Sequence, residues 1–308
     1  MATTAAALPE ALLDPIARPS RSLWSNAWFK LRHDRLTIIA SGVIVVLVLL
    51  SAAADLFATQ VFHYTFEQLD LLHTYEKPTL QPLAYLLGTD EIGRSQVVRL
   101  LYGGRISLTV GFVAAFVNLT VGVGLGLAAG YLRGVVDDVY NLIVTTIQSI
   151  PTLFLLLLIA AIWRPGPVTL TFVIGVLFWT GISLFVRGQT LALREREFVI
   201  AARTVGARDR RIMFRHILPN ILPLIFVLAA IDIGGIILVE SALSFLGLGI
   251  VPPTPTWGNM LTNATAYFIR APFLVIPPGA MIFVTVLSLY LIGDGLRDAL
   301  DPRIRGNG

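Results

Sequence analysis

The chain has 308 residues, of which 56% are hydrophobic and 14% are charged, and its formal net charge is +4. Soluble proteins of this size carry about 25% charged residues, so the composition excludes an ordinary soluble domain and indicates a membrane protein. Cysteine is absent, which excludes disulfides and thiolate sites. Neither of the two lysines, Lys30 and Lys77, follows a glycine, so the chain lacks the Gly-Lys-Ser/Thr phosphate loop of nucleotide hydrolases.

The N-terminal region precedes the first apolar segment. Residues 1–22 are rich in Ala, Pro, Ser and Arg, which predicts a disordered tail. Apolar residues recur at helical spacing over residues 22–35, which fits either an interfacial helix on the inner leaflet or a continuation of the first span. Small residues at 51–55 resemble a signal-peptide cleavage site. However, the 35 residues before the apolar core are too many for a leader, which favours an uncleaved anchor.

Six apolar segments are long enough to cross a bilayer, which requires roughly 20 residues. Backbone amides in lipid must pair within their own segment, so these segments are predicted to be helices. The predicted spans are residues 36–57, 106–131, 139–162, 168–190, 220–246 and 272–293. The predicted organisation is an N-terminal tail (1–35), a six-helix domain (36–293) with outer loops 58–105 and 247–271 and an inner loop 191–219, and a C-terminal tail (294–308).

Lysine and arginine are distributed unevenly between the two predicted sides. Of the 23 such residues, seventeen lie in the N-terminal region, the 132–138 turn, the 187–219 loop and the C-terminal tail. Because positively charged loops stay in the cytoplasm, this bias predicts that both termini are cytoplasmic. The outer cluster of Arg94, Arg99 and Arg105 runs against the bias.

Two predicted spans carry local packing signals. Gly122, Gly126 and Gly130 recur every four residues and form a smooth face that allows close helix approach. Internal packing is favoured for this face over a subunit interface. In the third span, Pro151 predicts a bend, and the nearby Gln148 either lines a cavity or helps to satisfy the freed backbone.

Two carboxylates fall within the fifth predicted span. Asp232 lies about twelve residues into it, roughly 18 Å deep and near the bilayer midplane. A charge there costs about 2.5–3.5 kcal/mol, so the side chain is expected to face protein or water. It is either a pore-lining group that meets a substrate's amino group or a buried structural carboxylate. Glu240 lies at the outer edge of the span, where a structural or gating role is favoured over substrate contact. The candidate pore-lining residues are Asp232, Gln148 and Glu240.

Other chemistry has no support in the sequence. No two histidines have metal-ligand spacing, and there is no Gly-x-Ser-x-Gly context for a nucleophile. The basic loop lacks the interleaved aromatic residues of a nucleic-acid platform. We therefore predict no catalytic residue, no metal, no cofactor and no nucleic-acid partner.

Charge is concentrated between the fourth and fifth spans. Residues 194–206 place Phe198, Ala201 or Ala202, and Val205 on one face of a short amphipathic helix, which Gly206 ends as a C-cap. A second helical piece, 207–217, is predicted to turn its arginines outward. A solvated basic loop would explain the arginines but not the order of helix, glycine, helix and Leu-Pro. We therefore predict a surface to which another protein docks.

This loop resembles the EAA loop of ABC-importer membrane subunits. That pattern is Glu-Ala-Ala, three residues, Gly, nine residues, and Ile-x-Leu-Pro. The positions that match in register are Ala201, Ala202, Gly206, Leu218 and Pro219, while Ile200 replaces the Glu and His216 replaces the Ile.

Three further segments resemble the peptide and nickel branch of that family. They are LGTDEIGRSQVVRLLYGGRISL (87–108), SALSFLGLGIVPPTPTWGNML (241–261) and GDGLRDALDPRIR (293–305). In the first segment, Ser95 and Val98 differ from the residues usual in the family's motif. The resemblance extends from about residue 30 to the end of the chain. It fits the "C"-type permease subunit of dipeptide and oligopeptide systems best.

The resemblance implies an all-α membrane protein of the bacterial inner membrane, with six transmembrane helices, the type I ABC-importer permease fold and a cytoplasmic pair of coupling helices. A second homologous permease would complete the pore, two ATPase subunits would bind beneath, and an external binding protein would deliver substrate. The chain itself would then catalyse no reaction. The ATPase-coupling residues would be Ala201, Ala202, Arg203, Gly206, Ala207, Arg208 and Pro219. Such permeases carry dipeptides, longer peptides, glutathione or nickel complexes, among which we favour peptides.

Two other functions compete with this interpretation. An ion-coupled carrier or channel would work without ATPase subunits, and Asp232 suits a proton-coupled carrier. Six spans without an evident internal repeat do not suit it, because carriers usually show paired halves. An intramembrane enzyme ranks last, because Asp232 has no second carboxylate or histidine at its predicted depth.

Overall fold

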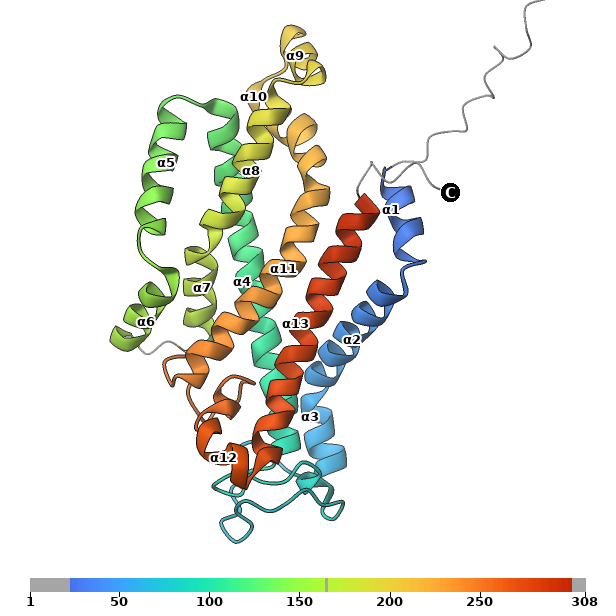
Figure 1. The fold of residues 1–308 in the computed structure, drawn as a ribbon, viewed down its shortest axis with the longest axis vertical. Helices are drawn as coiled ribbons and strands as arrows, with labels where there is room; N and C mark the ends of the chain where they lie inside the picture. Colours follow the sequence, from blue (N-terminus) through green and yellow to red (C-terminus); the bar gives the residue numbers. More distant parts are fainter. Residues whose placement is uncertain (1–22, 164–165, 301–308) are drawn as a thin grey trace, which may run out of the picture.

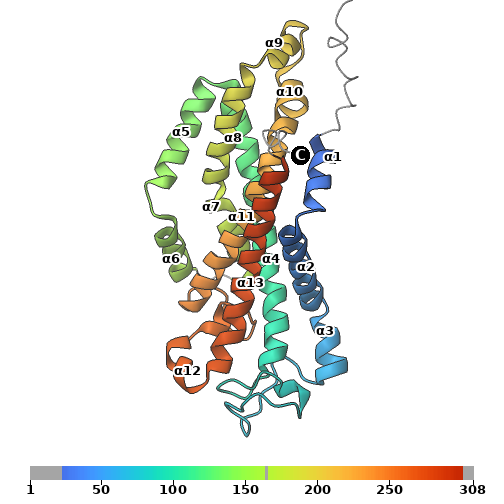
Figure 2. The same ribbon diagram turned by 45° about the vertical axis from the view of Figure 1, so that its right-hand side comes forward.

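The computed structural model describes residues 23–163 and 166–300, and all of its regular elements are helical. The predicted disordered tail over residues 1–22 and residues 301–308 of the predicted C-terminal tail lie outside these residues. Figure 1 shows long helices that run roughly along one axis, and Figure 2 shows the same bundle turned by 45°.

Five helical segments in the described part of the chain are long and apolar enough to cross a bilayer. They are Arg35–Ala52, Gln96–Leu132, Pro167–Arg194, Asp209–Phe245 and Pro272–Leu300. A sixth span results if the bent pair Val135–Gln148 and Thr152–Ile162 counts as one. Large apolar side chains such as Phe116 and Leu142 remain exposed on the outside of these helices, as a lipid environment requires.

The chain enters the bundle through two separate helices, α1 (Leu23–Leu31) and α2 (Arg35–Ala52). Asp34 caps α2, because its carboxylate accepts hydrogen bonds from the backbone N–H groups of Leu36 and Thr37. Helix α1 is therefore separate from α2 and does not simply continue the first span, whereas its place at the inner leaflet stays a prediction. A short helix, α3 (Ala54–Phe57), and a π-helical turn (Ala58–Phe62) follow α2.

Helix α4 (Gln96–Leu132) runs through the centre of the bundle (Figure 1). It begins ten residues before the predicted start at residue 106, because Ser95 caps its N-terminus by accepting a hydrogen bond from the Val98 N–H group. The charged residues near this end, Arg99 and Arg105, bond to protein groups and do not interrupt the helix.

The glycine face of α4 packs inside the subunit, against α8 (Trp179–Arg194). A Cβ atom on Gly122 would lie 2.9 Å from the Trp179 carbonyl oxygen, and one on Gly130 would lie 2.7 Å from the Thr190 Cβ atom. A Cβ atom on Gly126 would lie closer still to its neighbour, the Ser183 carbonyl oxygen. The prediction of internal packing is therefore correct.

The third predicted span is broken. Helix α5 (Val135–Gln148) ends before Ser149, and α6 (Thr152–Ile162) begins after Pro151 at an angle of 73° to it. The predicted bend is present but is a complete interruption of the helix. The fourth span consists of α7 (Pro167–Leu177) and α8, which Phe178 alone separates.

The last two long helices are α11 (Leu218–Phe245) and α13 (Pro272–Leu300), with the short helix α12 (Ala264–Arg270) between them. Helix α13 continues seven residues past the predicted end at residue 293. Two short helices, α9 (Glu197–Thr204) and α10 (Asp209–Ile212), lie at the same end of the bundle as α1 and the end of α13, whereas α3 and α12 lie at the opposite end (Figure 1).

Candidate functional site

The predicted coupling loop (residues 191–219, called the coupling loop below) has the helix–glycine–helix order that the sequence predicts. Gly206 follows α9 with φ +81°, a conformation that favours glycine. The N–H of Gly206 donates to the Arg203 carbonyl at 3.0 Å, and that of Ala207 donates to the Ala202 carbonyl at 3.1 Å. This pair of bonds is a Schellman motif, which ends α9 and turns the chain toward α10.

The two faces of α9 have different environments. Val199 is fully buried and packs in one cluster with Ile212 and Ile217, so it anchors the loop to the bundle. The predicted apolar face of Phe198 and Val205 points outward, with Val205 83% exposed. The sequence pattern identified this face but missed Val199, whose burial depends on distant parts of the chain.

Burial shows which of the two alanines of α9 shares the outward face with Phe198 and Val205: it is Ala201. Ala201 is exposed, while Ala202 is half-buried and packs against the same cluster. Arg203 and Arg208 are exposed beside them, and Pro219 is exposed at the start of α11.

Tyr131, at the end of α4, attaches the coupling loop to the bundle. Its hydroxyl donates to the Asp209 Oδ1 atom at 2.8 Å. The guanidinium carbons of Arg194 and Arg203 lie 5.6 and 5.7 Å from the centre of its ring, within the range of cation–π attraction. One aromatic side chain therefore contacts the end of α8, the short helix α9 and the start of α10. No sequence pattern identified this residue.

Two ion pairs reinforce the same end of the bundle. The Arg187 guanidinium on α8 binds both carboxylate oxygens of Asp137 on α5, at 2.6 and 2.7 Å. Arg133, just after α4, binds Glu195 at 3.1 Å. The first pair is partly buried and bidentate, which makes it the stronger of the two. Both connect elements that meet beside the coupling loop.

Asp232 lies in the middle of α11 and is half-buried. Its Oδ2 atom accepts a hydrogen bond of 2.6 Å from the Asn118 side-chain amide of α4. Asn118 is fully buried, and its own Oδ1 atom has no hydrogen-bond partner among the described residues. No ion pair to Asp232 is present in the described part of the chain, so its partner is an amide and not a cation.

Glu240 is fully buried near the C-terminal end of α11. It accepts hydrogen bonds from the Ser107 hydroxyl at 3.2 Å and from the Ser244 hydroxyl at 2.8 Å. Ser107 in turn accepts from the Trp257 backbone N–H group at 3.2 Å. These bonds join α4, α11 and the segment after α11 into one network. Gln148 is exposed at the end of α5, and no hydrogen bond connects it with either carboxylate.

Two family models match this chain. Residues 122–306 match the binding-protein-dependent transport system inner membrane component, and residues 22–78 match the N-terminal transmembrane domain of oligopeptide transport permease C. The first match covers more than half of the chain and includes the whole coupling loop. The chain belongs to the family of inner-membrane components of binding-protein-dependent transport systems.

Characterised relatives are similar over nearly their whole length. The oligopeptide transport system permease protein OppC of Haemophilus influenzae is 36% identical over 92% of this chain and 90% of the relative. OppC of Bacillus subtilis is 32% identical over 95% and 93%. The glutathione transport system permease protein GsiD of Pectobacterium atrosepticum is 36% identical over 92% and 93%. The chain is therefore a multi-pass inner-membrane permease of the ABC-importer class, as the motifs predicted.

A solved structure supports the fold. A chain of the MetNI methionine ABC transporter, in an inward-facing conformation, superposes with a TM-score of 0.52 at 20% identity, over 66% of this chain and 96% of that one. The predicted type I permease fold is confirmed. Permeases of this family are non-catalytic subunits, and membership implies partnership with ATPase subunits, a substrate-binding protein and another permease.

Proposed function

We propose that this permease forms half of the pore of an ATP-driven importer for peptides and that its coupling loop seats in an ATPase subunit. The observation that carries the proposal is the outward apolar face of α9, formed by Phe198, Ala201 and Val205. An apolar face held by a buried anchor on a rigid stem is suited to the groove of another protein. The exposed arginines of α10 border it and favour an acidic rim on the partner.

The movement of the ATPase would reach the pore through the contacts that attach the coupling loop to the end of α4. A displacement of α9 and α10 would act on Tyr131 and hence on α4, because Arg203 of α9 and Asp209 of α10 both contact that side chain. Helix α4 also carries Asn118, the partner of Asp232, so the same rigid helix connects the docking surface with the midplane carboxylate. ATP binding to the partner supplies the free energy, and this chain transmits motion between two arrangements of the bundle.

Replacing a small apolar side chain of α9 by a large charged one tests the docking surface. We expect Ala201→Arg to reduce co-purification of the ATPase subunits and ATP-dependent tripeptide uptake at least tenfold, while membrane insertion is unchanged. The matched control is Ala266→Arg on α12, which places the same side chain on an exposed position at the opposite end of the bundle. Normal uptake by Ala201→Arg, or uptake without any ATPase subunit, would instead favour the ion-coupled carrier.

The orientation in the membrane belongs to the same proposal. The coupling loop, α1 and the end of α13 share one end of the bundle, and most described lysines and arginines lie there (Figure 1). By the positive-inside rule this end faces the cytoplasm. Because the chain has no cysteine, Val205→Cys and Ile269→Cys can be labelled individually. A membrane-impermeant maleimide should reach Ile269→Cys from outside the inner membrane and Val205→Cys only after permeabilisation, and the reverse result refutes this orientation.

Peptides are the proposed cargo because two of the relatives are named oligopeptide permeases and a third is named for glutathione, itself a peptide. Uptake competition among trialanine, glutathione and a nickel–histidine complex tests the cargo. Stronger competition by the nickel complex than by trialanine contradicts the peptide assignment.

Within the pore, we propose Asp232 as the carboxylate that meets the amino group of the cargo, with Glu240 in a structural role and Gln148 at the pore wall.

A further inference from the structure

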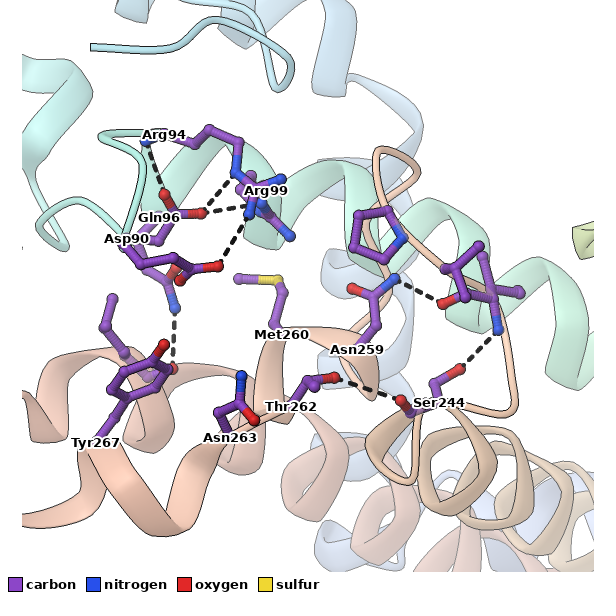
Figure 3. Close-up of a pocket in the computed structure, with 16 residues that line it drawn as sticks. Asp90, Arg94, Gln96, Arg99, Ser244, Asn259, Met260, Thr262, Asn263 and Tyr267 are labelled. Atoms are coloured by element: carbon purple, nitrogen blue, oxygen red, sulfur yellow. Dashed lines mark hydrogen bonds and ion pairs between the residues drawn. The ribbon is translucent and has the colours of Figure 1, made fainter. Parts of the chain in front are cut away.

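A cavity of about 260 Å³ with both polar and apolar lining residues lies at the end of the bundle opposite to the coupling loop. One wall is formed by the segment before α4 and its first turns, and the other by the end of α11, the chain that follows it and the start of α13. Figure 3 shows Asp90 and Arg99 on the first wall and Asn263 and Tyr267 on the second. None of these residues takes part in the coupling loop or in the network around Asp232.

The two arginines on the first wall share a single buried carboxylate. Arg94 and Arg99 are only 8% and 3% exposed, and both bind the same carboxylate oxygen of Asp90, at 2.7 and 2.9 Å. Glu91 lies on the rim, with its side chain 43% exposed and 3.5 Å from Arg94. Two buried guanidinium groups therefore share one buried carboxylate, while the second carboxylate, that of Glu91, lies on the exposed rim and pairs with Arg94 and not with Arg99.

The donors of Arg99 are not all used. Its Nη1 atom donates to Asp90, whereas its Nε atom is buried and has no hydrogen-bond partner in the described part of the chain. Leaving a buried charged donor unpaired is costly, and a planar guanidinium matches a carboxylate in a bidentate geometry. The N-terminus of α4 begins beside Arg99, at Gln96, and its dipole adds to the positive potential.

The rest of the lining suits an organic anion better than a bare inorganic ion. Apolar side chains of Ile250, Met260 and Leu274 line the cavity together with the polar side chains. A volume of about 260 Å³ is close to the lower end of the range for small-ligand pockets, roughly 300–1,000 Å³. The site thus combines one anion-binding corner with an apolar wall, as the carboxyl end of a short peptide requires.

We propose that this cavity is an outer receiving site that binds the terminal carboxylate of a peptide at Arg99. The inference rests on the proposed import of peptides and assigns the site that cargo meets before it enters the pore. Ser244, on the cavity wall, is twelve residues along α11 from Asp232, a separation of roughly 18 Å. A peptide would therefore contact Arg99 through its carboxylate first and Asp232 through its amino group later.

Equilibrium binding to the complete permease–ATPase assembly in lipid nanodiscs, without the binding protein, tests the site directly. The probes are trialanine and trialanine amide, which differ only in the terminal carboxylate. We expect the amide to bind at least tenfold more weakly than the acid. Arg99→Gln should weaken trialanine binding at least tenfold and abolish the difference between the two probes, while Asp90 keeps Arg94 as its partner.

Two further variants keep the test decisive. Arg270→Gln removes the same charge from an exposed position on α12 outside the cavity, and it should bind both probes as the unmodified protein does. Met260→Trp fills the cavity without altering its charge and should weaken trialanine binding, which decides the matter if Arg99→Gln fails to assemble. Equal binding of acid and amide, unchanged binding by the assembled variants, or no saturable binding overturns the receiving site. ATP-dependent trialanine uptake by the same assembly, supplied with the binding protein, would show that the proposed function survives such a result.

Discussion

The tight crossing of α4 and α8 provides a quantitative test of the packing. In Gly130→Ala, the new methyl carbon would lie 2.7 Å from the Thr190 Cβ atom and 2.8 Å from the Arg187 carbonyl oxygen. Carbon atoms in contact prefer about 3.5–4.0 Å, so the two helices must separate by about 1 Å. Thr190 cannot rotate away freely, because it is fully buried and its hydroxyl donates to the Val186 carbonyl.

The expected free-energy change follows from two opposing contributions. Overpacking of a close contact costs about 1–3 kcal/mol, while replacing glycine by alanine in a helix gains up to about 1 kcal/mol. Gly124→Ala is the matched control, since a Cβ atom there has no neighbour within 4 Å and only the gain applies. We therefore expect Gly130→Ala to be less stable than Gly124→Ala by about 1–3 kcal/mol.

The assay is equilibrium unfolding of the purified permease in mixed micelles with increasing dodecyl sulfate. The expected order of midpoints is Gly130→Ala lowest and Gly124→Ala at or above the unmodified protein. Equal midpoints for the two variants would show that α4 and α8 do not approach this closely in the folded protein, and the argument for the glycine face would then fail.

Three more predictions concern both ends of the bundle. Tyr131→Phe keeps the ring between the arginines but removes the bond to Asp209, at a cost of about 0.5–1.5 kcal/mol; hydrogen exchange of residues 207–212 should accelerate several-fold, and unchanged exchange contradicts the attachment. In Gly206→Ala, the alanine must adopt a left-handed conformation, which costs about 1–2 kcal/mol, so uptake should be slower. Gly206→Asn should reduce uptake less, because asparagine tolerates that conformation better. Equal reductions by the two variants would exclude backbone strain as the cause. Hydrogen bonds from the Tyr85 hydroxyl and then from His73 lower the pKa of Asp70 in the outer loop. The ionised Asp70 therefore stabilises the folded loop at any pH above the ordinary aspartate pKa of about 3.9, and this stabilisation is lost as the pH falls through the lowered pKa. Proteolysis of residues 63–95 should therefore accelerate only below about pH 4, and Asp70→Asn should remove that acid dependence; a transition near neutral pH would contradict it.

Much of the architecture follows from local and periodic features of the sequence. Long apolar stretches must form helices in lipid, because backbone groups have no other partner there. The spacing of Gly122, Gly126 and Gly130 indicated a close helix contact, and Gly206 marked the end of a short helix, because both signals arise within a few residues. Four motifs in a fixed order were sufficient to recognise the transporter family.

Helix ends were predicted less well, because they depend on caps and partners. Helix α4 begins at Gln96 since Ser95 caps it and since Arg99 finds a carboxylate in Asp90, so charges that resemble a loop in the sequence lie within a helix. Pro151 predicted a bend, but the 73° break also depends on how α5 and α6 pack against the rest of the bundle.

The amino-acid sequence by itself determined the class of protein, the number of apolar segments and the position of the coupling loop, because hydropathy, glycine spacing and motif order are properties of the linear chain. Only the tertiary structure decided which face of α9 is anchored, that Tyr131 attaches the loop to α4, and that Glu240 is enclosed by serine hydroxyls. The decisive contacts, such as Tyr131 with Asp209 and Ser107 with Glu240, join side chains far apart in the chain, whose proximity is created by helix packing and leaves no local pattern in the sequence.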